Sequence, residues 1–125
     1  NGRIDVMHEL AVTESVLEIA LRHATQVNAT QVTDIFLVIG RLSSIVDDSV
    51  QFYWNMIAEN TICQNANLHF KRVPARLRCL DCQFEFEVQD SLSPCPQCGS
   101  FHLNVIGGEE FYIESIIVEK EGAAL

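Results

Sequence analysis

The chain has 125 residues, 48% of them hydrophobic, which is enough to bury the core of one domain with a small insert. Its formal net charge of −9 disfavours non-specific binding to nucleic-acid phosphates or anionic lipids. No hydrophobic run approaches the roughly 20 residues of a membrane-spanning helix, and the start "NGRIDVMHEL" lacks the features of a secretory signal. We therefore expect a cytoplasmic protein with reduced cysteines and no disulfide framework.

The first predicted element is an amphipathic helix that begins just after Met7-His8-Glu9 and ends near Asn28. Its hydrophobic and small residues recur at helical spacing on one face, which comprises Thr13, Val16, Leu17, Ala20, Leu21, Ala24 and Val27. Residues 1–6 have the character of a cloning remnant or an unprocessed extension, so we exclude them from the predicted fold.

The run from Ile35 to Ile39 is rich in β-branched residues and predicts a short buried strand that ends at Gly40. Asp47 is a suitable N-cap for a second helix, "DSVQFYWNMIAE". One face of that helix collects the hydrophobic residues Val50, Tyr53, Trp54 and Ile57. The alternating stretch "ANLHFKRV" predicts a second strand, which Pro74 ends.

Near the end of the chain, "FHLNVI", "GG" and "EEFYIESIIVEK" have the pattern of strand, tight turn and strand. A strand–helix–strand crossover is normally parallel and right-handed, and the last strand can return antiparallel beside it. We therefore predict the α+β class, with a small mixed three-stranded sheet and two helices packed on it. That domain comprises residues 7–73 and 106–119, and a cysteine-bearing segment, residues 74–105, is inserted as a zinc-ribbon-like domain.

The inserted segment contains two C-x-x-C pairs, Cys79 with Cys82 and Cys95 with Cys98, separated by twelve residues. Four thiolates suit tetrahedral zinc, and such a closed site is usually structural because it leaves no open position for catalysis. "FEFEV" predicts a strand between the pairs, and Gly99 permits the left-handed backbone common in metal-binding turns. Iron is the rival metal, because "CPQCG" has the C-P-x-C-G form of rubredoxins, although "CLDCQ" lacks the matching glycine.

Other residues near the two pairs allow more than one interpretation. His102 follows Cys98 by four residues and could compete as a zinc ligand, although we favour a histidine outside the four-cysteine site. Cys63, at the end of the second helix, predicts a free and partly buried thiol. A run of basic residues is either a solvated strand and linker or a patch for an acidic protein partner: Lys71, Arg72, Arg76 and Arg78.

In the same order, "MHELAVTESVLEIA", "VIGRLSSIVDDSVQFYW" and "CLDC…CPQCGS" resemble the HypA/HybF family, the nickel-handling hydrogenase maturation proteins. The resemblance extends from Met7 to Glu119 and implies a nickel-binding α/β domain and a zinc-binding domain. It also implies that His8 binds Ni(II), with Glu9 contributing its backbone nitrogen or its side chain. Because Ni(II) accepts square-planar nitrogen donors, a terminal amine at Met7 can join the imidazole and two amides in one short chelate. Residues 1–6 turn that amine into an internal amide.

The resemblance implies a nickel metallochaperone, not an enzyme, that works with a maturation GTPase. It would deliver Ni(II) to the precursor of the [NiFe] hydrogenase large subunit, and in some bacteria the family also serves urease. The alternatives are a zinc-ribbon interaction module without nickel transfer and a rubredoxin-like electron carrier. The acidic charge disfavours nucleic acid as a partner, and we expect no membrane partner. Linkers near Pro74 and Val105 would allow a domain-swapped homodimer.

Overall fold

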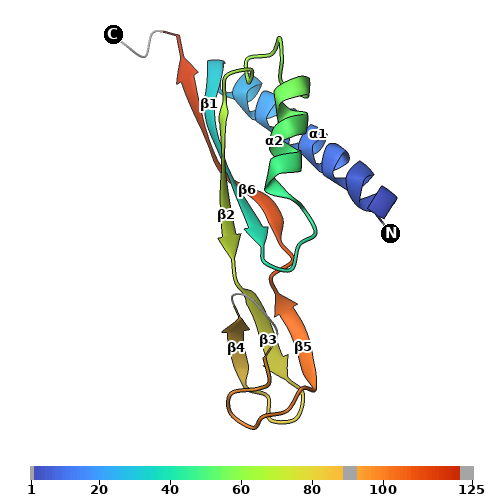
Figure 1. Ribbon diagram of the computed structural model, residues 1–125. Helices are drawn as coiled ribbons and strands as arrows, with labels where there is room; N and C mark the ends of the chain where they lie inside the picture. Colours follow the sequence, from blue (N-terminus) through green and yellow to red (C-terminus); the bar gives the residue numbers. More distant parts are fainter. Residues whose placement is uncertain (1, 89–92, 122–125) are drawn as a thin grey trace. The chain divides into compact units, whose positions relative to one another are not determined.

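The computed structural model describes residues 2–88 and 93–121, with side chains described from Glu9 onward. Its elements (Figure 1) are α1 (Gly2–Gln26), β1 (Ala29–Gly40), α2 (Asp47–Ile57), β2 (Asn67–Val73), β3 (Ala75–Cys79), β4 (Glu85–Val88), β5 (Leu103–Gly107) and β6 (Phe111–Lys120). The strands form two three-stranded sheets, in the orders β2-β1-β6 and β4-β3-β5. Neither described helix combines the length and the hydrophobicity needed to cross a membrane.

The first sheet is mixed, as predicted. β1 and β2 run in the same direction and β6 runs in the opposite one (Figure 1). Two hydrogen bonds set the antiparallel register of β1 and β6: Gly40 N donates to the Glu110 carbonyl over 2.8 Å, and the Thr33 hydroxyl donates to the Ile117 carbonyl over 3.3 Å. Both helices lie on one side of this sheet, so the predicted α+β class is confirmed.

The hydrophobic core of this part of the chain lies between the helices and β1. Side chains that are at most 3% exposed come from all three elements: Val16, Ala20, Ala24, Val32, Ile35, Leu37, Ile39, Val50 and Trp54. Each buried Val, Leu or Ile stabilises the fold by about 1.5–3 kcal/mol. β1 begins at Ala29, well before the predicted strand. Its first half is more polar, and there the Thr30 hydroxyl donates to the Glu119 carbonyl. Hydrophobicity identified only the buried end of the strand.

The N-terminal boundary predicted for the first helix is wrong. α1 begins at Gly2, so Met7-His8-Glu9 lie inside the helix and do not precede it. Residues 3–9 contain neither proline nor glycine, so nothing in them ends a helix. At the other end, Asn28 adopts a left-handed backbone with φ of 57°, which ends the helix close to the predicted position.

The predicted N-cap of the second helix is also wrong, because Asp47 is the first residue of α2. The N-cap is Val46, which has an extended backbone with φ of −102° and ψ of 123° and makes no side-chain capping bond. The carboxylate of Glu9 on α1 instead accepts a hydrogen bond from the Val46 backbone N–H over 2.6 Å. Asp47 and Asp48 lie in the first turn, where the helix dipole favours negative charge.

The two strands predicted near the end of the chain are present as β5 and β6, but they belong to different sheets, because β5 pairs with β3 whereas β6 pairs with β1. Gly108, which directly follows β5, lies in the connection between the two sheets. Gly108 has φ of 114°, and its carbonyl accepts the Leu42 N–H over 2.7 Å. A Cβ atom on Gly40 would collide with that same carbonyl, so the close approach of the two backbones requires glycine.

The second sheet has β3 at its centre, with β4 and β5 antiparallel on either side. β4 confirms the strand predicted from "FEFEV", whereas β3 was not predicted as a strand. By its contacts the chain divides into two compact units. The first comprises the chain up to Leu37, Ser44–Phe70 and the chain from Ile113, and the second comprises Val38–Ser43 and Lys71–Tyr112. The predicted boundaries of the two domains stay a prediction.

Candidate metal centre

The four cysteines of the C-x-x-C pairs form one cluster, in which the sulfur atoms all lie within 4.8 Å of one another. The Sγ atoms of Cys79 and Cys98 are 3.5 Å apart, and those of Cys82 and Cys95 are 3.6 Å apart. A tetrahedral zinc ion with thiolates about 2.3 Å away places its sulfurs about 3.8 Å apart. The sulfur spacing therefore fits a tetrahedral metal ion, and the described residues contain no second cluster of three or more such donors.

Each cysteine pair lies on a turn with the same backbone geometry. Gln83 N donates to the Cys79 carbonyl over 2.8 Å, and Gly99 N donates to the Cys95 carbonyl over 2.7 Å. Gln83 and Gly99 both have left-handed backbones, with φ of 70° and 79°. Gln83 reaches this conformation without being glycine, so the missing glycine in the first turn does not separate a zinc site from a rubredoxin-like iron site.

Backbone N–H groups and neighbouring thiols change the acidity of the second pair. Burial raises the pKa of Cys95, but hydrogen bonds from the N–H groups of Cys98 and Gln97 and from neighbouring thiols together lower that pKa to about 7. The Ser100 N–H lowers the pKa of Cys98, whereas the Cys79 thiol, burial and the other thiols raise it to about 12. A metal ion must therefore displace protons to bind all four sulfurs, which makes its binding dependent on pH.

Three polar side chains next to the cluster connect the two turns. Asp81 Oδ2 accepts a hydrogen bond from the Ser100 hydroxyl over 2.5 Å, and Asp81 Oδ1 lies 3.2 Å from His102 Nδ1. These two contacts lower the pKa of Asp81. His102 is exposed and outside the sulfur cluster. Sequence reasoning singled out His102 but missed Asp81 and Ser100, which have no signal beyond their position beside the cysteines.

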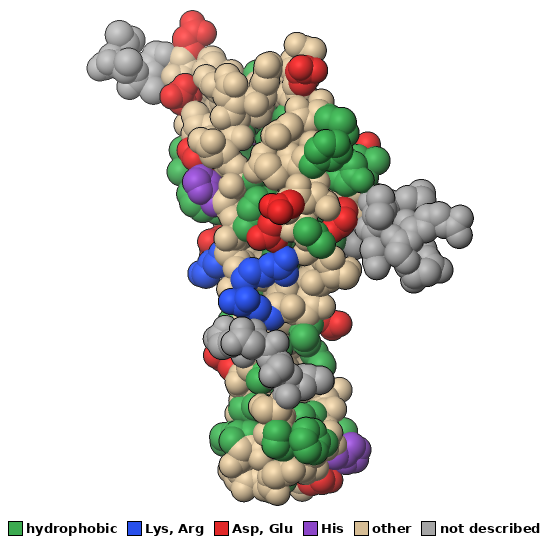
Figure 2. Space-filling model, viewed as in Figure 1, with side chains coloured by type: hydrophobic (Ala, Val, Ile, Leu, Met, Phe, Trp, Pro, Cys, Tyr) green, Lys and Arg blue, Asp and Glu red, His purple; other side chains and the backbone are tan. Residues whose placement is uncertain are grey.

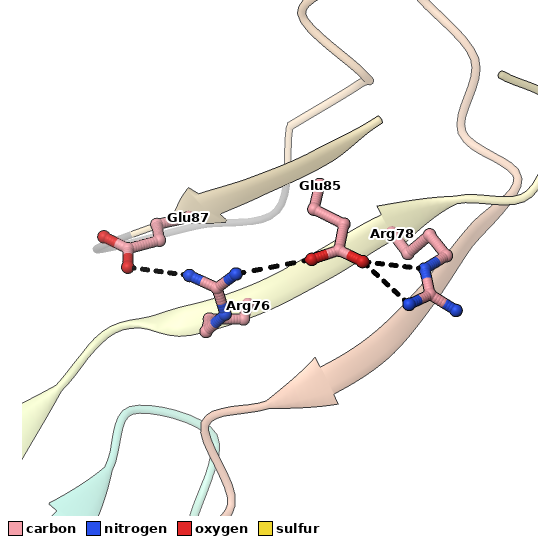
Figure 3. A network of polar contacts seen from close by, with 4 residues as sticks. All are labelled: Arg76, Arg78, Glu85 and Glu87. Carbon is pink, nitrogen blue, oxygen red and sulfur yellow. Dashed lines mark hydrogen bonds and ion pairs between the residues drawn. The ribbon is translucent and has the colours of Figure 1, made fainter. Parts of the chain in front are cut away.

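The arginines that lead to the first cysteine pair form exposed ion pairs with glutamates (Figure 3). Arg76 lies 3.1 Å from Glu87 and 3.4 Å from Glu85, and Arg78 lies 2.7 Å from Glu85. Arg72 donates to a backbone carbonyl over 2.9 Å. Although basic side chains gather in one cluster on the face shown in Figure 2, these intramolecular partners favour a solvated strand over a patch for an acidic partner.

The segment that the family resemblance associates with nickel belongs to the first unit. His8 has a helical backbone, and its side chain lies outside the described residues. Glu9 is described and is only 6% exposed, because its carboxylate accepts the N–H of Val46 and its carbonyl accepts the Thr13 hydroxyl over 2.7 Å. In this arrangement the Glu9 side chain joins two helices, and the roles of His8 and Glu9 at nickel stay predictions.

Comparison with known proteins gives matches over almost the whole chain. The model of a family described as "Hydrogenase/urease nickel incorporation, metallochaperone, hypA" matches residues 7–118. A protein named hydrogenase maturation factor HypA from Dehalococcoides mccartyi strain BAV1 is 40% identical over 115 residues, which cover 92% of this chain and 97% of the relative. The protein of the same name from Caldanaerobacter subterraneus subsp. tengcongensis is 40% identical over 114 residues, which cover 90% of this chain and all of the relative.

Two solved structures have the same fold. One is described as the solution structure of HypA protein, with a TM-score of 0.71 and 23% identity over 92% of this chain and 98% of the other. The second is described as the solution structure of the Ni metallochaperone HypA from Helicobacter pylori, with a TM-score of 0.65 and 22% identity over 90% of this chain and 98% of the other. At such identity the likeness concerns the fold.

Proposed function

The chain belongs to the HypA family of nickel-incorporation metallochaperones, and from this premise we propose that it binds Ni(II) near Met7 and delivers it during maturation of [NiFe] hydrogenase. The observation that carries the proposal is the family match, which begins at Met7 and continues through both cysteine pairs. The protein is therefore a carrier and not an enzyme.

In this proposal the four cysteines hold zinc in a structural role. The sulfur spacing supports a tetrahedral ion, and four thiolates close its coordination sphere. The metal then stabilises the second sheet, in which Leu77 is the largest fully buried hydrophobic side chain. Because so small a core contributes little, bound zinc substitutes for it.

Nickel binds, in this proposal, through nitrogen donors of Met7, His8 and Glu9. Inside α1 the backbone N–H groups donate to carbonyls four residues earlier, so they are not free to bind a metal. In a chain that begins at Met7, the first four N–H groups of the helix have no such partner. A terminal amine with a pKa near about 8 also gives up its proton to a metal at neutral pH. The extension formed by residues 1–6 therefore weakens the site.

Calorimetric nickel titration of two zinc-loaded chains tests this proposal. One chain has all 125 residues and the other begins at Met7. We expect the chain from Met7 to bind Ni(II) at least about tenfold more tightly and to release more protons, because it offers a terminal amine. His8→Ala in the chain from Met7 should abolish this binding, whereas Glu14→Ala on the exposed part of α1 should leave it unchanged. Nickel affinity that survives His8→Ala would contradict the proposal.

The partners of the proposed function are a maturation GTPase and the precursor of the hydrogenase large subunit, in the cytoplasm. The family description names both hydrogenase and urease, so urease is a second recipient to test. A domain-swapped homodimer stays a proposal. A zinc-ribbon interaction module without nickel transfer is the alternative function, and zinc-loaded protein that takes up no nickel would support it.

A further inference from the structure

We propose that Asp81 is a positioning residue for the four-cysteine metal site. Its carboxylate holds the two cysteine turns together and thereby slows release of the metal. The proposal rests on the proposed function only in taking the cysteines as the ligands of a zinc ion. It concerns a side chain that binds no metal itself and that the function described above leaves unused.

The carboxylate contacts of Asp81 reach from one turn to the other. Asp81 lies between Cys79 and Cys82, and both of its carboxylate oxygens contact residues that follow Cys98. Oδ2 accepts the Ser100 hydroxyl over 2.5 Å, and Oδ1 lies 3.2 Å from His102 Nδ1. One carboxylate thus holds two partners from the other turn. Hydrogen bonds to a charged acceptor are also stronger than those between neutral groups.

Backbone hydrogen bonds extend the same connection. The His102 N–H donates to the Ser100 hydroxyl oxygen over 2.9 Å, which fixes the hydroxyl while it donates to Asp81. Leu80 N, next to Asp81, donates to the His102 carbonyl over 2.8 Å. Cys95 N donates to the Ser100 carbonyl over 2.8 Å, so the residue that contacts Asp81 also holds a cysteine of the second pair.

The position of this network explains why it should affect the metal. The register of β3 and β5 ends at the pair of Cys79 and Leu103, so regular sheet pairing does not extend into the turns. Each turn supplies only two sulfurs, and the short sulfur distances join one turn to the other. Separation of the turns breaks the set of four sulfurs and therefore favours release of a zinc ion. Groups that hold the turns together without binding the ion therefore slow its departure.

Two other roles for the same side chains fit the contacts less well. In a serine–histidine nucleophile pair the hydroxyl donates to the imidazole, but the Ser100 hydroxyl donates to the Asp81 carboxylate. His102 could replace a cysteine at the metal, but its Nδ1 faces Asp81 and it lies outside the cluster of four sulfurs. The contacts therefore favour a role in holding the two turns together.

Transfer of zinc from the loaded 125-residue chain to a chromogenic chelator, at fixed pH, tests the proposal. A partner of a ligand typically changes metal affinity by about 10–100-fold, and this network is exposed and one step further away. We therefore expect Asp81→Ala and Ser100→Ala each to speed zinc release by about three- to tenfold. Asp81→Asn keeps an oxygen acceptor and should lie between Asp81→Ala and the parent. Glu109→Ala, which removes an exposed carboxylate from the same unit, should release zinc at the parent rate.

The double variant Asp81→Ala, Ser100→Ala gives the sharpest result. Because the two residues share one contact and each also has a contact of its own with His102, the double variant should release zinc faster than either single variant but by less than the product of the two single effects. If the rate increase of the double variant equals the product of the two single increases, or if Asp81→Ala releases zinc at the parent rate, the proposal is wrong. Faster release from His102→Ala than from Asp81→Ala would overturn it in favour of a histidine ligand. Parent protein that contains iron or no metal contradicts the zinc assignment instead, so the two failures are distinguishable.

Discussion

Cys63 and Cys95 lie in environments that shift the pKa of the thiol in opposite directions. Cys63 is fully buried and burial raises its pKa to about 11. Cys95 is also buried, but N–H donors from its own turn and neighbouring thiols lower its pKa to about 7. Hydrogen bonds to the sulfur, and not burial alone, decide which thiol ionises near neutral pH. The free thiol of Cys63 could be predicted because the other four of the five cysteines form the C-x-x-C pairs. Its complete burial could not be predicted, because it depends on tertiary packing.

Thiol titration of the zinc-loaded protein tests whether Cys63 is protected in the folded protein. Because the thiolate is the reactive form, we predict that Cys63 reacts with a disulfide reagent at pH 7 only after denaturant is added. A chelator alone should expose the four cysteines of the cluster, and denaturant should then release the fifth thiol. In Cys63→Ala the last step should disappear. A fifth thiol that reacts without denaturant would show that Cys63 is accessible in the folded protein.

At the scale of elements, periodicity predicted what each segment forms but not what it contacts. The helix faces and the strands β2 and β4 could be found because their spacing is local. β3 was missed because "ARLRC" is short and carries two arginines. The different sheets of β5 and β6 could not be predicted from their local pattern, because strand pairing depends on distant partners. The cap of α2 was wrong for the same reason, since Glu9 lies 37 residues from Val46.

The contact between Glu9 and Val46 leads to a stability prediction. Glu9→Ala leaves the Val46 N–H without its acceptor at the start of α2, which should lower the free energy of unfolding by about 1–3 kcal/mol. Glu9→Gln keeps an oxygen acceptor and should lose less, and Glu14→Ala should change stability by less than about 0.5 kcal/mol. Denaturant unfolding measures the energies, and amide exchange at Val46 locates the effect. Unchanged exchange at Val46 in Glu9→Ala would exclude the cap.

At the scale of the whole molecule, we expect the two metals to bind to two different compact units. The four sulfurs belong to the second unit, and the predicted nickel donors lie in α1 of the first. The spacing of the cysteines predicted their cluster, because C-x-x-C pairs bring sulfurs together through local turns. Nothing in the spacing of His8 and Glu9 predicts nickel, and that expectation depends on family resemblance. The two sites should therefore be separable by single substitutions.

Elemental analysis after nickel loading and gel filtration tests whether zinc and nickel bind at separate sites. The chain from Met7 should retain both about one zinc ion per chain and nickel, since four thiolates hold one zinc ion. His8→Ala should keep zinc and lose nickel. Cys82→Ser should lose zinc and the order of the second sheet but keep nickel, because the core of the first unit contains none of the four clustered cysteines. Nickel that is lost in Cys82→Ser and retained in His8→Ala would place the nickel at the cysteines and contradict the account.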